Sequence, residues 1–338
     1  MLIDVLKRLM AQQSLGRTEA RAVISTMTEG TVPPSLVGAV LAAWATKGET
    51  AEELTGAAEA LRERVIPIRV EQDIYVDTAG TGGDGQDTFN ISTAAALVAA
   101  GAGVTVAKHG NRAVSSRCGS ADVLGALGVE LELTPEQVSE CVARAGIGFL
   151  FASRLHPAFG AVAAIRRELR VRTLFNLLGP MVNPAGARHQ VMGVYAEQWV
   201  PVVGEVLAAL GARHALVVHG QGLDEIAVTG PTRIADVKEG QVREYEVTPQ
   251  SLGLQIWAPE ALKGGTPEQN ARILRDVLEG QRGGPRDAVL ANAAAALYVA
   301  GAADALEEGV SIAARTIDSG AASACLARLV ATSREVRQ

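Results

Sequence analysis

The stretch Ile74–Asp122 constrains the fold most, because two apolar segments in it each run into a loop of small and polar residues. Ile74–Val76 is typical of a short strand, and the glycine-rich sequence DTAGTGGD at 77–84 after it is expected to be a turn. A second strand is expected over Val104–Ala107, before KHGNR at 108–112. In a parallel sheet both loops would lie at one edge, where ligands bind in folds of this kind.

The segment between these strands predicts a helix whose N-terminus faces the glycine turn. Asn90–Thr93 offers N-cap residues, and an alanine-rich helix should follow over Ala94–Ala102. Free N–H groups at a helix N-terminus and in a glycine turn attract anions. Lys108 and Arg112 add two cations to the second loop. Its hydroxyl groups come from Ser115, Ser116 and Ser120. The pattern predicts a site for a multiply charged phosphate ligand.

Other phosphate motifs fit this stretch less well. The first loop matches neither G-x-G-x-x-G nor G-x-x-x-x-G-K-[ST], which weakens the dinucleotide and P-loop interpretations. For either loop alone, an ordinary strand-to-helix turn is an equally good interpretation. The two loops together, at the ends of consecutive strands, favour the phosphate site.

Composition limits the class of protein. The chain has 338 residues, 48% of them hydrophobic and 20% charged, so we expect a globular protein of one large domain or two. A net charge of −6 argues against a broad nucleic-acid surface. Widely spaced Cys118, Cys141 and Cys325 form no metal pattern and indicate reduced, cytoplasmic thiols. No apolar run is long enough to predict a membrane span.

The rest of the chain predicts helices over about residues 1–66 and then alternating strands and helices. Such alternation indicates an α/β fold with a largely parallel sheet. Further strands are expected at 129–131, 147–151, 190–194, 215–219, 233–238 and 242–248.

The motifs of the two loops resemble the anthranilate phosphoribosyltransferase family, whose members act in tryptophan biosynthesis. The resemblance begins with GTGGD at 80–84, NIST at 90–93 and KHGNRAVSS at 108–116. Later matches are HPAFGAVAAIRREL at 156–169, RTLFNLLGPMVNPA at 172–185, LDE at 223–225 and NAAAALY at 292–298.

The resemblance implies a fold and an assembly. A small N-terminal helical domain, 1–68, would be joined by helices from about 158–190. A larger α/β domain, 69–338, would bind phosphoribosyl pyrophosphate on a mostly parallel central sheet flanked by helices, as in the nucleoside phosphorylase and phosphoribosyltransferase superfamily. The expected partners are two small substrates and a second copy of the chain, bound through the helical domain as a homodimer. Nucleic acid and membrane are not expected partners.

The implied reaction transfers the 5-phosphoribosyl group of phosphoribosyl pyrophosphate to the amine of anthranilate and releases pyrophosphate. The cofactor implied is Mg²⁺, with two ions per subunit, held by Ser92, Asp224 and Glu225. Adjacent carboxylates after a strand suit magnesium, which prefers one or two carboxylates plus substrate phosphates. Without the resemblance, an Asp-Glu pair in a loop is more often solvated charge.

The resemblance also implies which residues bind each substrate. For phosphoribosyl pyrophosphate they are Gly80, Gly83, Asp84, Thr88, Asn90, Ile91, Ser92, Thr93, Lys108, His109, Gly110, Asn111, Arg112, Ala113, Val114, Ser115, Ser116 and Ser120. For anthranilate they are Gly80, Asn111 and Arg166. His109 is the one candidate to take a proton from the amine, and a packed histidine fits equally well. An arylamine is already nucleophilic, so catalysis can rest on positioning and on stabilising the leaving group.

Two other functions compete with this one. A pyrimidine nucleoside phosphorylase would share the fold, but it normally carries a KHSGR-like or KMSGR-like loop, and Asn111 with the intact Asp224–Glu225 pair argues against it. A non-catalytic relative that binds nucleic acid would be expected to lose these residues and gain a basic face. The acidic composition and the complete motif set disfavour it.

Overall fold

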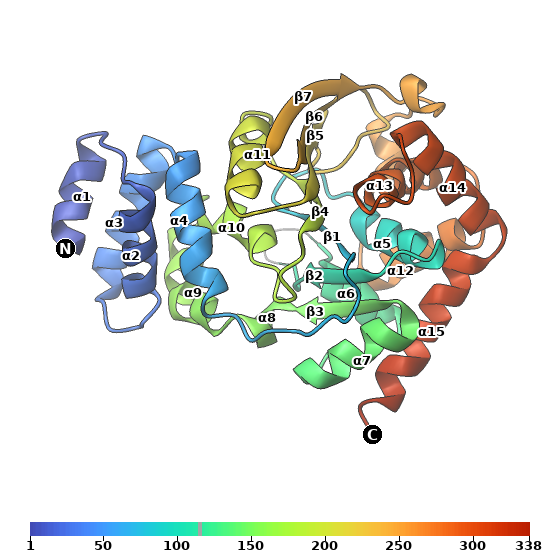
Figure 1. The fold of residues 1–338 in the computed structure, drawn as a ribbon, viewed down its shortest axis with the longest axis horizontal. Coiled ribbons are helices and arrows are strands. Elements are labelled where there is room, and N and C mark those ends of the chain that lie inside the picture. Colours follow the sequence, from blue (N-terminus) through green and yellow to red (C-terminus); the bar gives the residue numbers. More distant parts are fainter. Residues whose placement is uncertain (114–116) are drawn as a thin grey trace.

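A group of helices lies beside a sheet that carries further helices (Figure 1), in a computed structural model that describes residues 1–113 and 117–338. The first helices are α1 (Leu2–Met10), α2 (Arg17–Met27), α3 (Pro34–Lys47) and α4 (Ala51–Arg62). Two later helices, α9 (Pro157–Leu169) and α10 (Phe175–Met181), pack against α3 and α4. The predicted N-terminal helical region is therefore confirmed.

One sheet has the strand order β3-β2-β1-β4-β5-β6-β7. Its strands are β1 (Val76–Gly80), β2 (Val106–Gly110), β3 (Ile147–Phe151), β4 (His189–Gly193), β5 (His214–Gly220), β6 (Thr232–Lys238) and β7 (Gln241–Val247). The first five in this order pair in parallel, and β6 and β7 pair antiparallel. The predicted mostly parallel sheet is confirmed, and the carboxyl ends of β1, β2, β4 and β5 share one edge.

Helices flank both faces of this sheet. On one face α5 and α13 contact its strands, and on the other α11 does. The helices of this region are α5 (Ile91–Gly101), α6 (Ser120–Leu127), α7 (Pro135–Ala145), α8 (Ala152–Leu155), α11 (Trp199–Ala209), α12 (Pro267–Leu278), α13 (Gly284–Val299), α14 (Leu306–Asp318) and α15 (Ala321–Glu335). Short 3₁₀ turns are η1 (Gln250–Leu252) and η2 (Pro259–Leu262). Within the described ranges no helix is long and apolar enough to cross a membrane.

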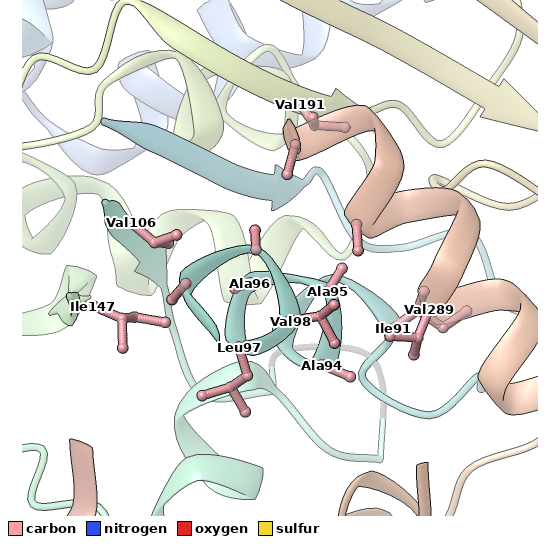
Figure 2. Packing of buried hydrophobic residues seen from close by; sticks show 14 of the residues in the cluster. Ile91, Ala94, Ala95, Ala96, Leu97, Val98, Val106, Ile147, Val191 and Val289 are labelled. Carbon is pink, nitrogen blue, oxygen red and sulfur yellow. The ribbon is translucent and has the colours of Figure 1, made fainter. Parts of the chain in front are cut away.

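Small side chains let α5 lie deep in the core. Its residues 93–100 are all buried, and most of them are alanine. Figure 2 shows α5 with Val106 of β2 on one side and Val289 of α13 on the other, and all three elements belong to one buried cluster. Because the helix is enclosed on all sides, its N-terminus is held at the strand ends.

The hydrophobic interior falls into two clusters. One joins α5, α13 and their neighbours to one face of the sheet. The other joins α1–α4, α9 and α10 to α11 and to the opposite face, so the helical region is continuous with the sheet through its core. The division into domains at residue 68 stays a prediction.

Three sequence-based expectations about strands and loops were wrong. Asp77–Gly80 is strand and not turn, because each residue of β1 pairs with β4 and this pairing overrides the local preference of glycine. Lys108–Gly110 likewise belongs to β2, paired with β3. Residues 129–131, which the structure describes, form no strand: the Glu130 N–H binds Ser333 Oγ at 3.0 Å, and the Leu131 N–H binds the Glu130 carboxylate.

Glu53 should be a main determinant of the stability of the helical region. Its fully buried carboxylate pairs with Lys47 Nζ at 2.9 Å and accepts hydrogen bonds from the Leu15 and Thr50 N–H groups. Glu53→Ala leaves the Lys47 ammonium buried without its partner, so the free energy of unfolding should fall by about 3 to 5 kcal/mol. Urea unfolding measures it. Exposed Glu52→Gln on the same helix should cost less than about 1 kcal/mol, and equal losses would contradict the account.

Candidate functional site

Two carboxylates join the loop after β5 to the glycine loop after β1. Asp224 Oδ2 accepts a hydrogen bond from the Gly82 N–H at 2.7 Å. Glu225 Oε1 accepts one from the Ser92 N–H at 3.1 Å, in the first turn of α5. Gly80 has no room for a side chain, because a Cβ there would lie 2.1 Å from Asp224 Oδ2. Four of the predicted residues, Gly80, Ser92, Asp224 and Glu225, thus come together at one edge of the sheet.

The glycine loop turns through a backbone conformation that favours glycine. Gly82 and Gly83 have φ values of 62° and 74°, in the left-handed region. Arg172, between α9 and α10, donates a hydrogen bond to the Gly83 carbonyl and lies 4.3 Å from the ring centroid of Tyr195. The Asp84 carboxylate accepts from the Gln86 N–H at 3.1 Å. The sequence placed Arg172 only in the family motif at 172–185 and not among the substrate-binding residues.

Negative charge gathers at this edge. Burial raises the pKa of Asp224 to about 7, and the nearby Asp84 carboxylate adds to the rise. Burial and then Asp224 raise the pKa of Glu225 to about 8, while Lys108 acts in the opposite direction. A cation would remove the repulsion that makes these carboxylates hard to ionise together.

The donor set fits a magnesium ion that also binds phosphate. Among residues 1–113 and 117–338, no three or more His, Cys, Asp or Glu side chains are grouped as a metal site. Two adjacent carboxylates and a nearby Ser92 hydroxyl are what magnesium uses when substrate phosphates supply its other ligands. The residues present therefore suit Mg²⁺ in a substrate complex better than a resident metal held by protein alone.

Lys108 is a buried residue of β2 whose side chain lies close to this edge. Its Nζ donates to the Thr78 carbonyl and lies 3.3 Å from Thr78 Oγ1 and 3.4 Å from Ser92 Oγ. Burial lowers its pKa, and the Asp77 and Glu225 carboxylates oppose that effect. The ammonium is thus beside the Ser92 and Glu225 side of the site, and not in a loop as the sequence suggested.

Asp77, which sequence reasoning missed, is fully buried in β1. It accepts a hydrogen bond from the His109 N–H at 3.0 Å. Burial raises its pKa to about 6, although Lys108 favours its charged form. In the sequence, a lone acidic residue at the start of a glycine turn is typical of a solvated charge. The structure shows instead that Asp77 belongs to β1 and is a buried negative charge near the Lys108 ammonium.

Asp122 closes the loop after β2. Its Oδ2 accepts hydrogen bonds from the Ala113 and Gly119 N–H groups, both at 2.9 Å, and its Oδ1 lies 3.2 Å from Arg112 Nη1. The sequence interpretation overlooked it, although an acidic residue three positions after Gly119 is a helix-start signal. Val114, Ser115 and Ser116 lie outside the described residues.

Asn111 and Ser120 border the same loop. Asn111 Oδ1 accepts a hydrogen bond from Ser153 Oγ of α8 at 2.8 Å, and Ser120 Oγ donates to the Asn111 carbonyl at 3.3 Å. Gly110 allows this approach, because a Cβ there would lie 2.1 Å from Ser120 Oγ. The predicted residues Gly110, Asn111, Arg112, Ala113 and Ser120 therefore cluster around one loop.

The remaining predicted residues near α5 have different surroundings. Asn90 is the N-cap residue of α5, as the sequence predicted, but its side chain makes no capping hydrogen bond. Its amide instead donates to the Cys118 carbonyl at 3.1 Å and accepts from Asn270 Nδ2 at 2.9 Å, which links the two loops. Ile91 and Thr93 are buried, and the Thr93 hydroxyl has no hydrogen-bond partner in the described part of the chain. Thr88 forms an isolated bridge with Lys263.

A row of rings connects β2 to Arg166. His109 Nε2 and His156 Nε2 are 2.9 Å apart and buried, and His156 packs edge-on against Phe159. Phe159 packs against Phe175, and the Arg166 guanidinium lies 5.3 Å from the Phe175 ring centroid. Burial lowers the pKa of both histidines, that of His156 to about 4, and also lowers the pKa of Arg166. The row lies between the sheet and the helical region.

Comparison with known proteins identifies the class. Residues 3–65 match the model described as "Glycosyl transferase family, helical bundle domain", and residues 72–323 match "Glycosyl transferase family, a/b domain". A curated anthranilate phosphoribosyltransferase from Anaeromyxobacter sp. (strain Fw109-5) is 61% identical over 99% of each chain. The chain is therefore a member of this glycosyl transferase family.

Solved structures narrow the class further. Anthranilate phosphoribosyltransferase from Thermus thermophilus superimposes with a TM-score of 0.93 at 47% identity, covering 98% of this chain and 99% of that one. The Saccharomyces cerevisiae enzyme in complex with PRPP and Mg superimposes with a TM-score of 0.89 at 28% sequence identity, covering 99% of this chain and 98% of that one. The structure of the same enzyme in complex with 4-fluoroanthranilate has a TM-score of 0.88 and a sequence identity of 26%, with the same coverage of both chains. The chain belongs to the anthranilate phosphoribosyltransferase family.

Gly193, at the end of β4, should tolerate no side chain. A Cβ there would lie 1.6 Å from the Asp224 carbonyl oxygen, so Gly193→Ala must displace the backbone of the carboxylate pair. We expect the free energy of unfolding to fall by about 1 to 3 kcal/mol, with a larger proportional loss of Mg²⁺-dependent turnover. Gly160→Ala in α9, where nothing lies within 4 Å, is the matched control. Unchanged turnover in Gly193→Ala would contradict this geometry.

His156 should make the protein sensitive to acid. Its pKa is about 4 in the folded chain and about 6.5 when unfolded, so the unfolded state binds more protons between these values. The stability that depends on neutral His156 is present above pH 6.5 and is lost as the pH falls towards 4. His156→Gln should reduce the difference in unfolding free energy between pH 7 and pH 5 by about 1 to 2 kcal/mol. Urea unfolding at both pH values tests this, and parallel curves would refute it.

Proposed function

We propose that the site transfers the 5-phosphoribosyl group of phosphoribosyl pyrophosphate to the amine of anthranilate, a Mg²⁺-dependent step of tryptophan biosynthesis. The main support for the proposal is one observation. The Asp224 and Glu225 carboxylates bind the glycine loop and the first turn of α5 at one edge of the sheet. Membership of the family along almost the whole chain agrees with it. The protein is thus a pentosyltransferase.

The leaving group is the first chemical problem of such a transfer. As the bond to pyrophosphate breaks, negative charge grows on the leaving group and positive charge on the ribose. The Gly82 and Ser92 N–H groups already bind the carboxylates, so other backbone N–H groups of the loop Gly80–Asp84 and of residues 90–93 would stabilise the negative charge. Mg²⁺, when bound, supplies charge neutralisation for the departing pyrophosphate. We assign its binding to Ser92, Asp224 and Glu225, with two ions per subunit, and Lys108 adds a cation beneath them.

The second loop would hold the rest of the donor substrate. We assign Lys108–Ser116 and Ser120 to the ribose and its 5-phosphate, with Arg112 as the exposed cation. Asp122 supports this assignment, because it ties the two ends of the loop together through backbone N–H groups. A donor substrate held at both ends presents its reacting carbon in a fixed orientation.

The acceptor would bind near Arg166. Its guanidinium has no carboxylate partner among residues 1–113 and 117–338 and packs over a ring, which suits a planar aromatic carboxylate. Gly80 and Asn111 would orient the amine towards the ribose. His109 is buried against His156 and its pKa is lowered well below 6.5, so burial opposes its protonation. We therefore assign the ring of His109 to holding β2 against α9, which leaves the His109 backbone in the donor-substrate site, and the arylamine needs no obligatory base.

We further propose a homodimer through the N-terminal helices. Met1, Ile3 and Met10 of the α1 region are exposed large apolar side chains, which favour an interface there. A cytoplasmic location and the absence of a nucleic-acid partner stay predictions. Three unpaired, buried cysteines and a net charge of −6 agree with them.

The function is tested by following the fluorescence of anthranilate, which should fall as the substrate is consumed. In the wild-type protein this fall should require both phosphoribosyl pyrophosphate and Mg²⁺. Asp224→Asn/Glu225→Gln should lose turnover by at least about 100-fold, because the metal ligands are neutralised. Arg166→Ala should raise the KM for anthranilate at least about tenfold, because the variant loses a charge-assisted contact. Its KM for phosphoribosyl pyrophosphate should change little.

Arg167→Ala is the matched control for Arg166→Ala, since Arg167 is the next residue of α9 and is exposed. It should behave as wild type. No turnover by a well-folded wild type would overturn the proposal. Phosphorolysis of thymidine or uridine, and binding of single-stranded DNA, would then be the activities to measure.

A further inference from the structure

We propose that Asn292, in the interior of α13, is a positioning residue that sets the geometry of the Asp224–Glu225 pair through the backbone of Ile226. The inference rests on the function proposed above, since it takes the two carboxylates to hold the metal. Asn292 lies outside the set of residues that the sequence interpretation assigned to the site.

The Asn292 side chain binds both backbone polar groups of one residue, Ile226, in the loop after β5. Its Oδ1 accepts a hydrogen bond from the Ile226 N–H at 2.9 Å, and its Nδ2 donates to the Ile226 carbonyl at 3.0 Å. The second hydrogen of Nδ2 goes to the Ala288 carbonyl, one turn earlier in α13, at 2.9 Å. Every hydrogen of the amide is used, and the side chain is 2% exposed. A flipped amide would set donor against donor, so one orientation is fixed.

These hydrogen bonds act on the residue next to the metal ligands. Ile226 follows Glu225 directly, so fixing the Ile226 N–H also fixes the peptide plane that leaves Glu225. Asp224 and Glu225 then reach the Gly82 and Ser92 N–H groups. The helix α13, which carries Asn292, packs along α5, whose first turn supplies the Ser92 N–H. Asn292 and the group that binds Glu225 are therefore held by the same pair of packed helices.

A merely structural role would not require this arrangement. The buried side chain of Ile226 already anchors the loop in the core, and the Ala227 N–H is bound by Thr232 Oγ1 at 2.9 Å. The amide of Asn292 adds a directional constraint to this anchoring. Groups that orient metal ligands without touching the metal typically change metal affinity about 10- to 100-fold when they are removed.

The test compares Asn292→Ala and Asn292→Ser with Ser333→Ala. The serine variant can still bind the Ala288 carbonyl within α13 but cannot bracket Ile226, so it is the milder of the two and serves if the alanine variant fails to fold. Ser333 is the matched control, because it is a buried helix residue that binds the backbone N–H of a distant loop, at Glu130. Ser333→Ala should lower stability without affecting the metal site.

Two readouts separate positioning from stability. In metal-free protein, hydrogen exchange at the Ile226 N–H should become at least about tenfold faster in the Asn292 variants, with neighbouring amides of α13 unchanged. Binding of Mn²⁺ in the presence of phosphoribosyl pyrophosphate, followed by the electron paramagnetic resonance of free Mn²⁺, should weaken about tenfold or more. The KM for anthranilate should not move, because Arg166 lies elsewhere.

The outcomes distinguish this inference from the function on which it rests. If Asp224→Asn/Glu225→Gln loses Mn²⁺ while the Asn292 variants bind it as tightly as Ser333→Ala does, the positioning role is wrong and the metal site stands. If the double carboxylate variant binds Mn²⁺ as wild type does, the metal assignment itself fails, and the positioning role fails with it. Weakened Mn²⁺ binding in both Asn292 variants, with fast exchange at Ile226, supports the inference.

Discussion

The site depends on two carboxylates held against backbone N–H groups at the end of a parallel sheet. Asp224 and Glu225 bind the Gly82 and Ser92 N–H groups, and burial raises the pKa of each. Both residues are half-buried, and two such adjacent carboxylates are hard to ionise together without positive charge nearby. Lys108, whose Nζ lies 3.4 Å from Ser92 Oγ, supplies part of that charge. Because the charged forms of these carboxylates are disfavoured without a cation, the site should attract a cation that is accompanied by phosphate.

Close packing makes this arrangement possible. Gly80 lets the Asp224 side chain approach β1, and the alanine-rich α5 brings its N-terminus to the strand ends. The helical region is attached firmly to this scaffold, since Arg62 Nε donates to the Met181 carbonyl at 2.8 Å and a row of rings runs from β2 to α9. The proposed acceptor residue Arg166 is thus placed by contacts made at the boundary between helices and sheet.

The sequence predicted most of the fold, because alternating apolar patterns and loop chemistry are local signals. The common edge of the strands and the prominence of the Asp224–Glu225 pair were both accessible in this way. Asp77 and Asn292 were not, since each acts through a partner distant in the chain or in a neighbouring strand. The strand expected at 129–131 failed for a related reason: its alternating pattern is real, but the Glu130 backbone is bound by Ser333 and not by a neighbouring strand.

The most direct test of the central claim is a crystal structure of the protein with phosphoribosyl pyrophosphate and Mn²⁺, in which anomalous scattering locates the metal. The account predicts an anomalous peak about 2.1 Å from an oxygen of Asp224 or Glu225, with the pyrophosphate against the glycine loop and the first turn of α5. A metal bound away from this edge, or a pyrophosphate bound without contact to either loop, would contradict it.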